Sequence, residues 1–132
     1  MEQQIYDTEQ QLQRCTTDNE RLVLLHKLAT LFFTSDLPRA VDILAEALSL
    51  AQTLGEQDMI ADISTELGRC YYTLDKPAEA REYFVRAQQW YEQIGDNRRS
   101  IGSLMGLASC ALASGNSVGS VEIYTKVLEY CE

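Results

Sequence analysis

The hydrophobic positions of this chain follow a helical period, and the pattern recurs about every 40 residues. Apolar and small residues are spaced i, i+3, i+4, i+7 throughout, and no strand-like alternation competes with them. The pattern of residues 40–55 returns at 80–95, and a third copy occupies 120–131. A repeat of this length is typical of helical arrays, in which each unit buries its apolar face against the next. We therefore predict an all-α array of antiparallel helix pairs.

Helix start and stop signals divide the array into seven predicted helices. Thr17-x-x-Glu20 has the form of a capping box, and Pro38 and Pro77 suit a first helical turn after the polar start signals Ser35-Asp36 and Asp75. Three glycines mark helix ends or turns: Gly55, Gly95 and Gly115. The predicted helices cover residues 2–15, 18–34, 37–53, 57–74, 77–93, 97–114 and 117–131.

These helices predict a leading helix followed by three repeats. The leading helix occupies 1–17, and the repeats occupy 18–56, 57–96 and 97–132. The first helices of repeats one and two are offset by 39 residues and the second helices by 40, so the turn around 34–36 is one residue shorter. Repeat three is degenerate and lacks the ending of the earlier repeats, which favours a fragment of a longer protein.

The second repeat carries a known motif. Residues 67–71 read L-G-x-x-Y, residues 80–87 read A-x-x-x-F-x-x-A, and together they resemble the tetratricopeptide repeat (TPR). The resemblance covers 18–132 and implies a right-handed helical-repeat solenoid, with small residues at close helix contacts and Tyr71 and Phe84 filling the space between helices. The long repeat and the leading helix resemble N-terminal regions of bacterial signalling proteins, which often precede diguanylate cyclase or histidine kinase domains.

Composition and charge exclude several kinds of function. The net charge of −9 argues against nucleic acid or an anionic membrane as partner. The four cysteines lack metal-ligand spacing, His26 is the only histidine, and no catalytic set or cofactor motif is visible. We therefore predict no enzyme activity, no metal and no cofactor within these residues. No signal peptide is visible, and the uncharged stretch 100–121 is too polar for a membrane helix. Nothing suggests a disulfide framework among the four cysteines, so we expect a cytoplasmic protein.

The remaining candidate for function is the surface of the first helices, which line the concave side in TPR proteins. A stripe beside each core stripe predicts a partner-binding groove: Val23, His26, Thr30 and Phe33; Asp62, Thr65, Arg69 and Tyr72; Gly102, Met105, Ser109 and Leu112. Phe33, Tyr72 and Leu112 form a row of large apolar residues, which favours an apolar or aromatic anchor of a protein or peptide. The alternative is that these three residues pack on each other or on the leading helix.

The last predicted helix is apolar on more than one side. Its outward residues Val121, Tyr124 and Leu128 predict a dimer face, because an uncovered last repeat leaves apolar surface in water.

The sequence leaves three functions open: a protein-interaction module in bacterial signalling, an oligomerisation scaffold, or the peptide-sensing arm of a transcription regulator.

Overall fold

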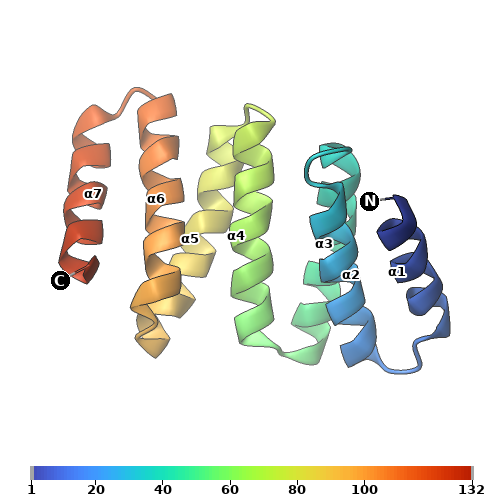
Figure 1. Ribbon diagram of the computed structural model, residues 1–132. Coiled ribbons are helices and arrows are strands. Elements are labelled where there is room, and N and C mark those ends of the chain that lie inside the picture. The colour runs from blue at the N-terminus through green and yellow to red at the C-terminus, as the bar shows by residue number, and fades with distance from the viewer. Residues whose placement is uncertain (1, 132) are drawn as a thin grey trace. The chain divides into compact units, whose positions relative to one another are not determined.

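The computed structural model describes residues 2–131, and over this range it contains seven α-helices and no strand (Figure 1). The helices are α1 (Glu2–Arg14), α2 (Asp18–Phe32), α3 (Leu37–Leu54), α4 (Gln57–Thr73), α5 (Pro77–Ile94), α6 (Asn97–Ala113) and α7 (Ser117–Cys131). The predicted all-α class is confirmed, and no helix end differs from its predicted position by more than two residues.

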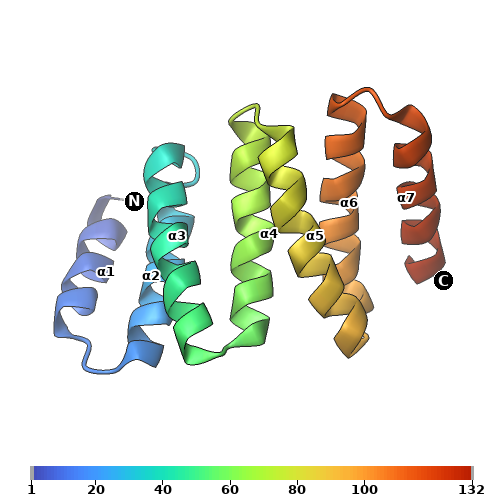
Figure 2. The same ribbon diagram turned by 180° about the vertical axis from the view of Figure 1, so that it is seen from behind.

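The chain forms two compact units, and the division between them falls inside α4, between Ile63 and Ser64. Unit 1 contains α1, α2, α3 and the start of α4; unit 2 contains the rest of α4 with α5, α6 and α7. In unit 1, α2 packs against α1 and α3; in unit 2, α6 packs against α5 and α7 (Figures 1 and 2). The division into a leading helix and three repeats stays a prediction.

Short polar side chains begin several of the helices. The Thr17 hydroxyl accepts the Glu20 backbone N–H at 3.2 Å, which supplies one half of the predicted capping box. Asp96 likewise accepts the Arg99 N–H at 3.1 Å. The start of α5 differs from the prediction, because the N-cap residue is Lys76 rather than Asp75, and its side chain makes no capping hydrogen bond.

The turns within helix pairs explain the missing residue of the first repeat. The turn after α4 contains Asp75 with φ 64°, and the turn after α6 contains Gly115 with φ 81°. In the first of these turns the Lys76 N–H donates to the Tyr71 carbonyl at 2.9 Å, a bond that closes the helix end when one residue is left-handed. The turn after α2, residues 33–36, has no left-handed residue. The turn after α2 is therefore one residue shorter because it lacks the residue with left-handed backbone that the other two turns contain.

Replacing Asp75 with glycine is expected to stabilise the protein by about 0.5–1 kcal/mol, because Asp75 is a non-glycine residue in the left-handed region. Urea unfolding followed by circular dichroism measures the change. Gly115→Asp at the equivalent turn provides the matched control, and it should destabilise by a similar amount. A lower midpoint for Asp75→Gly would show that the Asp75 side chain stabilises the turn by other means.

The core of unit 1 lies between α1, α2 and α3. Leu28, Phe32 and Ala40 form a buried cluster, and Ile5 and Leu12 of α1 pack against it. The leading helix thus covers the outer face of α2, which would otherwise expose apolar side chains to water.

The core of unit 2 is built around the ring of Phe84. A Cβ added to Gly68 of α4 would lie 2.9 Å from this ring, and one added to Gly106 of α6 would lie 2.5 Å from it. Because van der Waals contact between carbons begins near 3.5 Å, both positions accept only glycine without a shift. The small Gly68 thus permits the close helix contact that the TPR resemblance implies.

A buried amide side chain connects the helices of unit 2. Gln88 of α5 donates to the Ser100 hydroxyl at 2.7 Å and to Glu92 Oε1 at 2.9 Å, and it accepts from the Ser103 hydroxyl of α6. Glu92 also accepts from Lys126 of α7. The hydrogen bond from Lys126 lowers the pKa of the Glu92 carboxyl, and the same bond raises the pKa of Lys126. The network therefore fixes α6 and α7 against α5.

Two of the four cysteines are buried. Cys70 and Cys110 are core residues, whereas Cys15 is half-buried and Cys131 is exposed, and none of the four forms a disulfide. Burial raises the pKa of Cys70 to about 11, with a smaller contribution from Glu66, and burial also raises the pKa of Cys110. Both thiols are therefore protonated at neutral pH and act as small apolar side chains.

Candidate functional site

Unit 2 exposes three large apolar side chains that belong to the predicted groove stripe, on α4 and α6. Tyr72 at the end of α4 is 42% exposed, and Met105 and Leu112 of α6 are 49% and 52% exposed. The two helices are neighbours here, since a Cβ on Gly102 of α6 would lie 3.6 Å from the guanidinium of Arg69 on α4. These residues form what we call the α4–α6 face.

Two predicted groove residues of unit 2 have hydroxyl groups that already form hydrogen bonds within the protein. Thr65 is only 8% exposed, and its hydroxyl lies 3.4 Å from the hydroxyl of Tyr91 on α5. Tyr91 reaches across from α5, so Thr65 belongs to the core and not to an open groove. The Ser109 hydroxyl donates to the Met105 carbonyl at 3.1 Å. The α4–α6 face is therefore mainly apolar, with Arg69 as its cation.

The predicted stripe of unit 1 is only partly open. Val23 and Thr30 of α2 are exposed, whereas His26 is half-buried. Phe33 is also half-buried and packs against the Leu28–Phe32–Ala40 cluster of α2 and α3. Asp62, also half-buried, is on the part of α4 that belongs to unit 1. Phe33 thus belongs to one unit and Tyr72 and Leu112 to the other, so the three-residue row stays a prediction.

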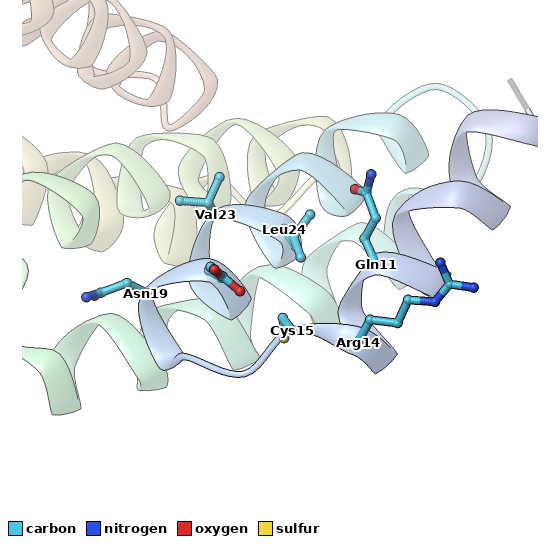
Figure 3. Close-up of a pocket in the computed structure, with 7 residues that line it drawn as sticks. Gln11, Arg14, Cys15, Asn19, Val23 and Leu24 are labelled. Carbon is cyan, nitrogen blue, oxygen red and sulfur yellow. The ribbon is translucent and has the colours of Figure 1, made fainter.

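Unit 1 has an open hollow that the sequence did not indicate. It lies at the turn between α1 and α2, has a volume of about 580 Å³ and is shown in Figure 3. Its lining consists of Gln11, Arg14, Cys15, Asn19, Glu20, Val23 and Leu24. Arg14 and Asn19 stand at opposite ends, and Val23 is shared with the predicted groove (Figure 3). No sequence signal marks such a hollow, because its shape depends on how α1 packs against α2.

The predicted dimer face on α7 is exposed. Val121 and Leu128 are 63% and 66% exposed and Tyr124 is 39% exposed. The structure adds Val118 of the same helix, which is 71% exposed and which the prediction omitted. The helical spacing of Val118 and Val121 could have identified it.

The described residues offer no metal-binding group. Between residues 2 and 131, no cluster of three or more histidine, cysteine or acidic side chains could hold a metal ion. In the same part of the chain, no helix is both long enough and apolar enough to span a membrane.

Helix pairs with small residues at their contacts define a TPR-like helical-repeat protein, and solved structures confirm this class. A putative kinesin light chain from Podosopora anserina with nearly identical TPR-like repeats has a TM-score of 0.83 and 19% identity, over 97% of this chain and 65% of that one. The model for the family of soluble NSF attachment protein, SNAP, matches residues 5–131. The chain therefore belongs to this TPR-like family.

Two further similarities concern smaller parts of other proteins. A Rap protein complexed with competence and sporulation factor has a TM-score of 0.75 and 25% identity, over 84% of this chain and 31% of that one. Outer dynein arm-docking complex subunit 4 of Mus musculus is 29% identical over 91 residues, which are 69% of this chain and 14% of the subunit. This chain thus spans only a small part of that relative. TPR-like repeats are typically non-catalytic protein-interaction modules.

Proposed function

We propose that the chain is a non-enzymatic protein-interaction module that binds its partner on the α4–α6 face. The observation that carries the proposal is the exposure of Tyr72, Met105 and Leu112, which are large apolar side chains with about half of their surface in water. Large apolar side chains gathered on one face favour binding of an apolar or aromatic anchor. Arg69 beside them suits an acidic group on the partner. In unit 1, the predicted stripe residues Val23, His26 and Thr30 of α2 are proposed as a surface of their own, of which Val23 and Thr30 are exposed and His26 is half-buried.

The relatives support a protein or peptide as the partner. The Rap protein was crystallised with competence and sporulation factor, and the dynein-arm relative is a subunit of a docking complex. The SNAP family is named for attachment to another protein. These names describe association with another molecule or assembly, which is the activity proposed here.

Alanine at Tyr72 is expected to weaken partner binding by at least about tenfold while leaving the melting temperature nearly unchanged, because the side chain contributes to a contact and not to the core. The partner is captured from the source cell lysate with the parent chain, and its affinity is then measured by calorimetry. Leu112→Ala should act in the same direction.

Ile94→Ala is the matched control, since Ile94 is equally exposed at 42% but lies at the end of α5. It should leave the affinity unchanged. Equal affinities for the parent and Tyr72→Ala would reject the α4–α6 face as the binding site.

The cellular role within this function is also a proposal. The long-repeat resemblance favours the cytoplasmic regulatory N-terminal part of a bacterial signalling protein, with a peptide-sensing arm of a transcription regulator as the alternative. The similarity to a Rap protein is compatible with signalling, whereas the dynein-arm relatives are mammalian. The sequence of the gene beyond residue 132 tests this role, because a cyclase or kinase domain there supports it.

A homodimer through α7 is the second candidate, and the exposed row of Val121, Tyr124 and Leu128 favours it. Light scattering at micromolar concentration measures the mass directly. A mass that stays monomeric from dilute to concentrated samples would exclude the oligomerisation scaffold.

A further inference from the structure

Helix α7 carries apolar residues along two opposite sides. The inner stripe comprises Ser120, Ile123, Val127 and Tyr130; Ser120 is buried and the other three are half-buried. The outer stripe comprises Val118, Val121, Thr125 and Leu128, all of them exposed. At 3.6 residues per turn these two sets lie on opposite sides of the helix. Because the inner stripe accounts for the packing of α7 on α6, the fold of unit 2 makes no use of the outer stripe.

The outer stripe has the spacing of a helix-pairing seam. Its members follow one another at intervals of 3, 4 and 3 residues, which is the a and d pattern of a heptad. The one polar member, Thr125, donates its hydroxyl to the Val121 carbonyl at 2.9 Å. Its polar group is thus satisfied within the helix. The stripe therefore presents a narrow apolar surface that matches the apolar side of another helix.

Charge along the seam indicates what kind of helix fits. Glu122 and Glu129 each follow a seam residue and lie along one edge, in the positions that flank a heptad seam. The other edge holds the uncharged Tyr124 and Cys131. The nearest cation on α7, Lys126, is engaged with Glu92 of α5. The acidic edge is therefore complementary to basic residues on a partner.

A second copy of the chain does not supply these basic residues. In an antiparallel two-fold pair, Glu122 and Glu129 of both copies would share one edge, and like charges there are destabilising. In a parallel pair, each acidic edge would face Tyr124 and Cys131 of the other copy, which provide no cation. Charge complementarity thus favours a different protein.

We propose that the outer stripe of α7 docks an amphipathic helix of another protein, with an apolar seam flanked by lysine or arginine. This site differs from the α4–α6 face, since it uses only side chains of α7. The module would then hold two partners, one on each surface.

The test uses three synthetic helical peptides and the 132-residue chain. The first has a leucine seam with lysine flanks, the second has the same seam with glutamate flanks, and the third has the lysines but a scrambled seam. Fluorescence anisotropy at about 0.15 M salt, where weak long-range attraction is screened, measures each affinity. We expect the first peptide to bind at least about tenfold more tightly than the other two.

Three variants locate the site. Val121→Asp combined with Leu128→Asp should abolish binding of the first peptide, and Glu122→Lys combined with Glu129→Lys should reverse the preference toward the glutamate-flanked peptide. Met105→Asp on the α4–α6 face is the control for position, and it should leave the affinity for the first peptide unchanged. Circular dichroism melting confirms that each variant is folded, which is expected because all the substituted residues are exposed.

Several outcomes would overturn the proposal. These are equal binding of all three peptides, unchanged binding by the folded α7 double variants, or a dimer that Val121→Asp with Leu128→Asp dissociates, which would make a second copy the occupant. Loss of binding with Met105→Asp alone would assign the peptide to the α4–α6 face. None of these results depends on Tyr72, so failure here is distinguishable from failure of the proposed function.

Discussion

Replacing Phe84 with alanine is expected to cost about 3–5 kcal/mol of the free energy of unfolding, the largest loss from any single substitution considered. The ring is 1% exposed and lies between Gly68 and Gly106, where no other side chain can fill the space that its removal leaves. Urea unfolding with two-state fitting measures the loss. A loss below about 1 kcal/mol would mean that α4 and α6 collapse onto α5 and close the cavity.

Two glycines of α6 provide a matched pair for the same contact. Gly106→Ala should destabilise by about 1–3 kcal/mol, because the new Cβ would lie 2.5 Å from the Phe84 ring. Gly102→Ala, one turn earlier, should be neutral or stabilise by up to about 1 kcal/mol, since its Cβ would meet only Arg69 at 3.6 Å and alanine favours the helix. Equal effects at the two positions would show that helix propensity, and not contact with Phe84, decides them.

A double variant separates the contact between residue 106 and the Phe84 ring from the effect of alanine on helix propensity. Phe84→Leu shortens the side chain, so Gly106→Ala should cost less in that background than in the parent. The difference between the two costs is the coupling energy of the pair. Strict additivity would show that residue 106 and the ring do not interact.

Replacing Gln88 with leucine is expected to destabilise by about 1–3 kcal/mol, the second large effect. The substitution removes the amide partner of the buried Ser100 and Ser103 hydroxyls, of which Ser103 keeps its hydrogen bond to the Ser100 carbonyl at 3.0 Å. Gln89→Leu is the control, because Gln89 is the exposed neighbour on the same helix and its loss should stay within about 0.5 kcal/mol.

The serines also provide a rescue. The triple variant Gln88→Leu, Ser100→Ala, Ser103→Ala also removes the two buried hydroxyls that lost the amide, so part of the lost stability should return. A triple variant less stable than Gln88→Leu alone would show that the serines stabilise α6 independently of the amide.

The sequence by itself determined the helices of this protein. Local signals act within one turn: Asp96 caps the next N–H groups, Pro77 fixes a first turn, and Gly95 ends a helix with φ 72°. The helical period and the repeat of about 40 residues added which side of each helix is apolar, and Leu28, Leu67 and Leu104 are buried on that side. All of this is encoded over a few residues, and it needs no knowledge of which helices meet.

The tertiary structure alone decided which side chains remain at the surface. Thr65 and Met105 occupy equivalent places in the repeat, yet Tyr91 of α5 covers Thr65 while Met105 stays exposed. A Cβ at residue 106 would clash with the Phe84 ring and one at residue 102 would not, although the two glycines lie one turn apart on the same helix. Such differences arise from side chains that approach from another helix, and the spacing of residues along one helix carries no information about them.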